Sequence, residues 1–216
     1  TLICACETIR RENIDKLGDV EITIGLWVGG DVTPNSIKGA EYSLNELHSF
    51  SEHSKDNDES IANKFIILSC PWCNTSMSPN EYKIKTNNFL FVCSNNSCDF
   101  SLDQKSLPIK VIDTEIYKNP PTLLIGTIDK FATLPWREDA INAYDSNYIK
   151  KFLPPDLIIQ DELHLISGPL GSIAGMYEII INAITERKVN DKIIKAKIIG
   201  STATISRANM QIKNLY

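Results

Sequence analysis

Four of the six cysteines are spaced like the ligands of a zinc ion. Two of them form a Cys-x2-Cys turn that encloses Pro71 and Trp72, and two form a wider Cys-x4-Cys turn. The strand-like segment 82–92 between the pairs is typical of a zinc ribbon, in which a hairpin brings two pairs of thiolates to one tetrahedral ion. Four thiolates leave no open position for catalysis, so we expect a structural Zn²⁺ held by Cys70, Cys73, Cys93 and Cys98.

Two disulfides are the alternative for these four cysteines. The chain lacks the basic and then apolar start of a signal peptide, and Cys4 and Cys6 lie in a further apolar segment, so a reducing, cytoplasmic compartment and zinc are favoured. A module of about 40 residues has little core of its own, so the metal would supply its folding free energy. Cys4 and Cys6 are expected to be buried thiols, and His48 and His53 to be solvated side chains of a polar loop.

An acidic pair follows an apolar run in the second half of the chain. Residues 157–160 read as a buried strand, and Asp161 and Glu162 come directly after it. In a parallel sheet the carboxyl ends of the strands form the ligand crevice. Asp161 could hold Mg²⁺ there while Glu162 orients or deprotonates an attacking water. Taken alone, such a pair is more often a solvated turn or the charge at a helix N-terminus.

Two further apolar runs also end in polar side chains. The segment 198–200 leads into Ser201, Thr202, Ala203 and Thr204, and the segment 123–126 leads into Thr127, Asp129 and Lys130. A third run, 21–28, ends in Gly29 and Gly30 and reads as a strand entering a tight turn. Strands that alternate with helix-patterned sequence predict a mostly parallel α/β sheet whose polar strand ends share one site.

These residues resemble the first RecA-like domain of superfamily 2 helicases. Asp161-Glu162-Leu163-His164 is similar to the DExH box of motif II, and Thr202-Ala203-Thr204, which follows Ser201, to the S/T-A-T of motif III. Gly29-Gly30 resembles the GG motif and Thr127 to Lys130 resembles motif Ib. The resemblance implies a partial RecA-like domain with an inserted zinc ribbon, with Asp161, Glu162 and His164 as catalytic residues. It also implies that the GG and Ib segments touch the backbone of DNA or RNA.

Four longer sequence segments indicate which group of helicases the chain resembles. GLWVGGDVTPN, CPWC, PTLLIGTIDKFATLPW and QDELHLISGPLGS are similar to the large helicase subunit of DISARM-type phage-defence systems, the DrmA-like proteins. The resemblance implies ATP and Mg²⁺ as cofactors of the full-length parent. It implies as partners a nucleic acid, a second RecA-like domain of the same parent chain and other subunits of the defence system.

The chain lacks two sets of motifs that the resembling helicases contain. There is no G-x-x-x-x-G-K-[ST], so the phosphate-binding loop of motif I is missing, and so are the arginine motifs of a second RecA-like domain. We expect a fragment of a longer ATPase that is inactive alone. The strand with Ile198 and Ile199 would keep an unpaired edge, because the motif I strand lies beside it in the resembling fold.

The composition and the net charge indicate the general class of the chain. The net charge of −5 and 43% hydrophobic content fit a folded chain and exclude a polycationic tail, and no run of about 20 apolar residues predicts a membrane span. Residues 1–17 have the spacing of a helix. The predicted organisation is listed in chain order: the N-terminal part of the RecA-like domain (1–44), an acidic polar loop (45–63), the zinc ribbon (64–107) and the remainder of the RecA-like domain with the DExH box and motif III (108–216).

Two other functions compete with the helicase fragment. The first is a non-enzymatic zinc-binding module that contacts nucleic acid or a partner protein, in which the carboxylates are only surface charge. The second is a metal-dependent nuclease that uses Asp161, Glu162 and Lys130, but the spacing of these residues matches no recognisable nuclease site.

Overall fold

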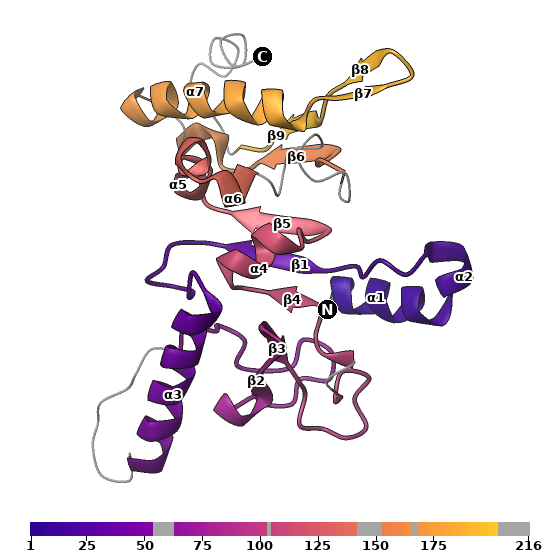
Figure 1. Ribbon diagram of the computed structural model, residues 1–216, viewed down its shortest axis with the longest axis vertical. Helices are drawn as coiled ribbons and strands as arrows, with labels where there is room; N and C mark the ends of the chain where they lie inside the picture. Colours follow the sequence, from indigo (N-terminus) through magenta and orange to yellow (C-terminus); the bar gives the residue numbers. More distant parts are fainter. Residues whose placement is uncertain (54–62, 103–104, 142–152, 166–167, 203–216) are drawn as a thin grey trace. The chain divides into compact units, whose positions relative to one another are not determined.

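The computed structural model describes residues 1–53, 63–102, 105–141, 153–165 and 168–202 (Figure 1). The chain divides into two compact units, Thr1–Lys130 and Phe131–Tyr216. The division falls within the region 108–216, for which the sequence predicts the continuous remainder of one domain. Each unit is described by itself.

Unit 1 is built on a three-stranded parallel sheet in the order β4-β1-β5. Strand β1 (Ile24–Trp27) occupies the centre, and β4 (Ile109–Lys110) and β5 (Leu123–Gly126) pair with it in parallel register. Helix α4 (Asp113–Lys118) contacts β1 (Figure 1). The predicted strands ending at Gly29-Gly30 and at Thr127 are therefore neighbours, with Leu26 opposite Ile125.

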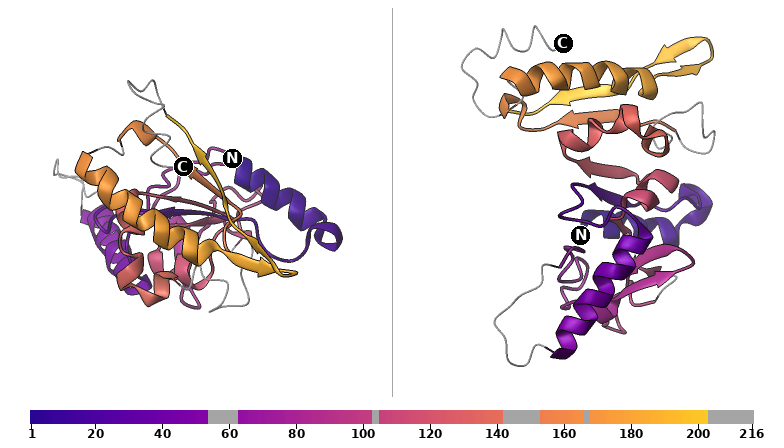
Figure 2. Two further views of the ribbon diagram at one scale, coloured as in Figure 1. Left: turned by 90° about the horizontal axis from the view of Figure 1, so that it is seen from above. Right: turned by 60° about the vertical axis from the view of Figure 1, so that its left-hand side comes forward.

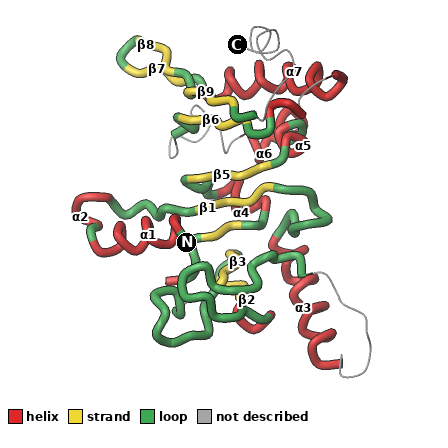
Figure 3. Tube along the Cα trace, turned by 180° about the vertical axis from the view of Figure 1, so that it is seen from behind, coloured by secondary structure: helices red, strands yellow, loops and turns green. Residues whose placement is uncertain are grey.

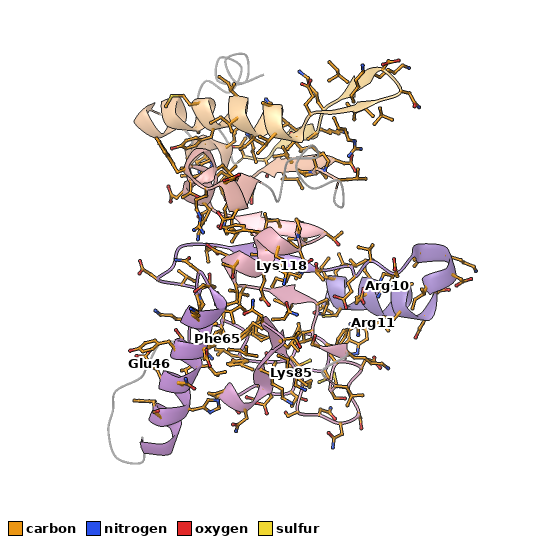
Figure 4. The ribbon with its side chains drawn as sticks, viewed as in Figure 1. Arg10, Arg11, Glu46, Phe65, Lys85 and Lys118 are labelled. Atoms are coloured by element: carbon orange, nitrogen blue, oxygen red, sulfur yellow. The ribbon has the colours of Figure 1, made fainter. Side chains whose placement is uncertain are left out.

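The predicted N-terminal helix is present but broken. Helix α1 (Leu2–Glu12) and the short α2 (Ile14–Leu17) are separated at Asn13, and the chain leaves α2 through Gly18 at φ +81. On α1, the fully buried Glu7 receives hydrogen bonds from Arg10, from Arg11 and from the backbone N–H of Ile22, at 2.7–2.9 Å. Burial acts to raise the pKa of Glu7, but these donors outweigh it and the pKa lies below its usual value. Figure 4 labels Arg10 and Arg11 on this helix.

Helix α3 (Ile37–His53) corrects part of the predicted acidic loop. Residues 45–53 form its last turns, and only 54–62 of the loop lie outside the described residues. The physical reason is an apolar stripe at helical spacing, since Ile37, Ala40, Leu44 and Leu47 are all buried. His48 is half-buried on this helix rather than solvated in a loop. The side chain of His53 lies outside the described residues.

The cysteine module is a hairpin with long connecting turns (Figure 3). Strands β2 (Tyr82–Lys85) and β3 (Asn88–Phe91) pair antiparallel and follow the 3₁₀ turn η1 (Pro79–Glu81). The two turn residues Thr86 and Asn87 both have positive φ, as a tight hairpin requires.

The core of unit 1 joins this module to the rest of the unit. Buried side chains of the module and of α3, together with Cys4, Val111 and Ile112, form one cluster. Phe65, labelled in Figure 4, stacks on Phe89 with ring centroids 4.5 Å apart. Many buried side chains of the cluster, among them Phe65, Phe89 and Phe91, come from the module itself, so the expectation that the module has little core of its own is wrong.

Unit 2 has a two-stranded parallel sheet, β6 (Leu157–Gln160) with β9 (Lys197–Gly200). Between them the chain forms the 3₁₀ turn η4 (Leu163–Leu165), helix α7 (Gly168–Thr185) and the antiparallel hairpin of β7 (Arg187–Val189) and β8 (Lys192–Ile194), which Figure 2 shows beyond the end of α7. Helix α5 (Ile128–Phe131) spans the division between the units, and η3 (Leu134–Trp136) and α6 (Glu138–Ile141) follow it.

The sequence indicated β5, β6, β9 and α7 from their apolar periodicity. It did not indicate β4, α4 or the β7–β8 hairpin. The fold class is nevertheless as expected: α/β with parallel pairing in both units and a small inserted antiparallel hairpin.

Candidate metal centre and motif II–III site

The four predicted zinc ligands lie together in unit 1. Each offers one Sγ atom, and all four Sγ atoms lie within 4.8 Å of one another. The Sγ atoms of Cys70 and Cys98 are 3.9 Å apart, and those of Cys73 and Cys93 are 3.5 Å apart. A zinc–sulfur distance of about 2.3 Å in a tetrahedron puts sulfurs roughly 3.8 Å apart, whereas a disulfide needs about 2.05 Å. The cluster therefore has the dimensions of a metal site, and all six cysteines are free thiols.

Tight turns aim the thiols at this common point. In the first turn, the N–H of Asn74 donates to the carbonyl of Cys70 and Asn74 has φ 62. In three cases the backbone N–H two residues further on donates to the sulfur: Thr75 to Cys73, Asn95 to Cys93 and Phe100 to Cys98. These donors stabilise thiolates, the form that binds metal.

The thiols differ in acidity because their surroundings differ. A hydrogen bond with the hydroxyl of Thr75, whose oxygen lies 3.2 Å from Sγ, is the main cause that lowers the pKa of Cys73 to about 6. Burial instead raises the pKa of Cys93 and of Cys98 above the usual value of a thiol. A divalent cation would supply the positive charge that these two buried sulfurs need to ionise, which is the fit expected of a Cys₄ zinc site.

The cysteine module also contacts α1 and Thr1, the residue before it. Phe100 lies edge-to-face with Trp72, and the guanidinium of Arg11 lies 5.2 Å from the centroid of the Phe100 ring. The hydroxyl of Thr1 donates to the carbonyl of Pro71 at 2.9 Å. Cys4 is buried in the shared core and Cys6 is half-buried, so only Cys4 fully matches the predicted buried thiol.

In unit 2, the structure brings the segments predicted as motif II and motif III side by side. Because β6 and β9 are parallel with Gln160 opposite Gly200, the residues that follow each strand emerge at the same sheet edge. The N–H of Leu163 donates to the carbonyl of Ser201 at 3.0 Å, which fixes the two segments to each other.

His164 contacts both segments. Its Nδ1 lies 3.1 Å from Oε2 of Glu162 and 3.4 Å from Oγ1 of Thr202. Glu162 itself has φ 51, a left-handed conformation that a non-glycine residue seldom adopts, and its N–H donates to Oδ1 of Asp161 at 3.0 Å. Such backbone strain is concentrated at functional sites in proteins. The side chains of Glu162 and His164 are partly open to solvent, as a site that receives a ligand must be.

Not every predicted residue of this edge can be placed. Ala203 and Thr204 lie outside the described residues. The strand that ends in Thr127 belongs to the β4-β1-β5 sheet, and β6 and β9 form a separate sheet. The expected single edge shared by all three strand ends therefore stays a prediction.

The predicted nucleic-acid segments are adjacent in unit 1. The N–H of Thr127 donates to the carbonyl of Trp27, so the end of β5 is fixed beside the strand that leads to Gly29 and Gly30. Gly29, Gly30, Thr127 and Asp129 are exposed. Lys130 differs, because its Nζ lies 2.5 Å from Oδ2 of Asp113 and only 12% of its side chain is exposed.

Sequence reasoning missed the polar residues that support these sites. Asp113 and Glu115, both buried on α4, have no sequence signal beyond an acidic first turn of a short helix. Gln160 donates to Oε1 of Glu178 at 2.9 Å and so joins the end of β6 to α7. Their role depends on long-range contacts that no local motif encodes.

Together these features define a class: a partial RecA-like α/β fold with an inserted four-cysteine module that could hold a metal such as zinc. Over an alignment of 252 positions that covers the whole chain, it is 31% identical to the DISARM protein DrmA of Bacillus paralicheniformis. This similarity confirms the resemblance to the DrmA-like proteins. The chain spans 22% of the length of that relative. No family model matches the chain.

None of the helices in the described ranges combines the length and the apolar composition needed to cross a membrane.

Proposed function

We propose that the chain carries the motif II and motif III half of an ATP-dependent nucleic-acid helicase or translocase, as part of a longer cytoplasmic protein that acts in phage defence. The observation that carries the proposal is His164, whose Nδ1 lies within 3.4 Å of both the motif II residue Glu162 and the motif III residue Thr202. The left-handed backbone of Glu162 adds to this support, because such conformations are enriched at functional sites as well as in turns.

Each residue then has a distinct role. Asp161 would hold Mg²⁺, which neutralises charge on the transferred phosphoryl group when it is bound. Glu162 orients and deprotonates the attacking water. His164 would couple Glu162 to Thr202, because its Nδ1 lies near the side-chain oxygens of both residues. The phosphate-binding loop and the second RecA-like domain would come from other parts of the longer protein, since the sequence contains neither.

The zinc module would serve a structural role beside this site. Four thiolates fill the tetrahedron, so the metal has no position left for water or substrate. The nucleic acid would be contacted through its phosphate backbone by main-chain groups near Gly29 and Gly30 and by the Thr127–Lys130 segment, with weak sequence preference and with affinity that falls as salt rises. Other subunits of a defence system are the proposed protein partners.

The test uses the full-length protein that contains this chain. Glu162→Gln should keep nucleotide binding and nearly abolish hydrolysis, because the carboxylate acts on water and not on the bound nucleotide. Asp161→Ala should weaken Mg²⁺-dependent binding instead. Asp191→Asn, at the tip of the β7–β8 hairpin with 93% of its side chain exposed, is the matched control. Normal turnover in both motif II variants would refute the assignment.

The zinc-binding module without enzymatic function is the second candidate, and the compact four-sulfur cluster favours it equally. Isothermal titration of the 216-residue chain with ATP and Mg²⁺ measures whether this chain binds nucleotide without the rest of the longer protein. We expect no tight binding and no hydrolysis by the chain alone, because the phosphates would lack their main-chain cradle. Micromolar binding would reveal a complete nucleotide site.

A further inference from the structure

A buried polar network lies beneath the two segments proposed to contact nucleic acid. At its centre is Asp113, which is fully buried at the start of α4. Its Oδ2 accepts hydrogen bonds from Nζ of Lys130 at 2.5 Å and from the hydroxyl of Tyr117 at 3.3 Å. That hydroxyl accepts from Nε1 of Trp27 at 3.0 Å. The network therefore joins α4 to the last residue of β1 and to the segment after β5.

Asn35 extends the network to the glycine turn. Its Oδ1 accepts from Lys130 Nζ at 3.3 Å, and its carbonyl accepts from the N–H of Thr114 on α4. Its amide lies so close to Gly30 that a Cβ at Gly30 would come within 2.8 Å of Nδ2. Lys130 thus bridges the segment after β5 and the loop that contains Gly29 and Gly30.

The charge of Lys130 is already compensated. Asp113 is buried, its second oxygen Oδ1 has no hydrogen-bond partner among the residues that the structure describes, and Lys130 is the cation recorded beside it. Moving the ammonium to a phosphate would leave a buried carboxylate without a counter-charge, which is strongly unfavourable. Lys130 is therefore poorly suited to neutralise a phosphate, contrary to its predicted direct contact.

We propose that Asp113 is a positioning residue which, through Lys130 and Asn35, holds the Gly29–Gly30 turn and the Thr127–Lys130 segment in one fixed arrangement for binding a nucleic-acid backbone. The proposal rests on the proposed function, because it assigns how two segments of that site are oriented. Lys130 contributes geometry to binding, and the exposed main chain of the two segments makes the contact.

The first test measures binding of the zinc-loaded 216-residue chain to fluorescein-labelled oligothymidine and oligouridine across a series of KCl concentrations. Asp113→Asn and Lys130→Met should each weaken binding about tenfold, and the double variant should be no weaker than either single variant, because both act through one contact. The slope of log affinity against log salt should stay that of the wild type. Lys38→Met, an exposed lysine on α3, is the matched control.

Several outcomes would overturn the proposal. A slope reduced by about 1 in Lys130→Met would show a direct phosphate contact. If Asp113→Asn bound the oligonucleotides more tightly and with a steeper salt dependence, the carboxylate would merely neutralise a lysine that can otherwise bind phosphate. If the buried substitutions prevent folding, Asn35→Ala, which keeps the buried pair, should still weaken binding without changing the slope, and wild-type affinity in that variant would also refute the idea.

A second measurement keeps this proposal separate from the proposed function. Amide hydrogen exchange should accelerate in both 29–35 and 127–131 when Asp113 is replaced by asparagine, whether or not any nucleic acid binds. Failure of the wild-type chain to bind either oligonucleotide would remove the nucleic-acid assignment alone. Unchanged exchange in one or both segments would remove the positioning role of Asp113.

Discussion

Glu115 offers a sharp test of the packing between α4 and the cysteine module. Its carboxylate is buried, with 8% of the residue exposed, and accepts a hydrogen bond from the backbone N–H of Phe89 at the start of β3. Burial raises the pKa of Glu115 to about 7 from the usual 4.5, although the Phe89 N–H and the nearby ammonium groups of Lys110 and Lys118 oppose this rise. The folded state therefore binds this proton more tightly than the unfolded state does.

The sign of the pH effect follows from linkage. A raised folded-state pKa stabilises the fold below the unfolded value of 4.5, and this contribution is lost as pH rises through about 7. Each pK unit corresponds to about 1.4 kcal/mol, so between pH 5 and pH 8 the wild type should lose about 2.5 kcal/mol from this group. Glu115→Gln keeps an acceptor for Phe89 but cannot ionise, so it should lack this loss.

The assay is urea denaturation of the zinc-loaded chain between pH 5 and pH 8. A Trp136→Phe background leaves Trp27 and Trp72, both in unit 1, as the fluorescent reporters. Glu12→Gln, which removes an exposed carboxyl group from α1, is the matched control. Comparing variants at each pH cancels the protonation of the cysteines, which affects all of them alike. Parallel stability curves for wild type and Glu115→Gln would refute the reasoning.

Three further predictions address other parts of the chain. Glu7→Ala should destabilise unit 1 by about 3 to 5 kcal/mol in the same denaturation assay, because it leaves the 6% exposed side chain of Arg10 without its carboxylate partner, and a loss under 1 kcal/mol would contradict the buried ion pair. Metal analysis of protein purified without chelator should give close to one zinc per chain, and Cys98→Ser should abolish it, whereas two disulfides and no metal would exclude the site. Self-association in light scattering should fall in Ile199→Lys, since β9 pairs with β6 alone among the described strands and Ile199 is 41% exposed, and unchanged association would rule out this edge as the contact.

The sequence was most informative where the signal is short-range. Cys-x2-Cys spacing and a Cys-x4-Cys turn are enough to predict the four-sulfur cluster, because each pair sits in one turn and the hairpin between them is tight. The apolar runs that became β5, β6 and β9 are equally local. The neighbourhood of Glu162 and Thr202 followed from parallel pairing of two such strands, although their link through His164 did not.

Prediction failed where polar composition or long-range contact decides the structure. The acidic residues of 45–53 suggested a loop, but Leu44 and Leu47 continue the buried stripe of α3 and the helix continues with them. The resemblance to motif Ib implies that Lys130 touches the nucleic-acid backbone, which stays a prediction, but the sequence did not indicate its ion pair with Asp113. Its partner Asp113 lies 17 positions earlier in the chain and on another element, and no periodicity connects the two.

Helix α4 is only six residues long, but it contacts both the segment of Lys130 and the cysteine module. Asp113, in its first turn, contacts Lys130 beside the proposed nucleic-acid segments, and Glu115, two positions further on, contacts Phe89 of the cysteine module. Both carboxylates are buried, so neither contact can shift without exposing a charge to an apolar environment or leaving a partner unsatisfied. A displacement of the module that moves Phe89 must therefore either break its bond to Glu115 or move α4, and with it Asp113. One short helix therefore connects the cysteine module to the Lys130 segment and, through Asn35, to the loop that contains Gly29 and Gly30.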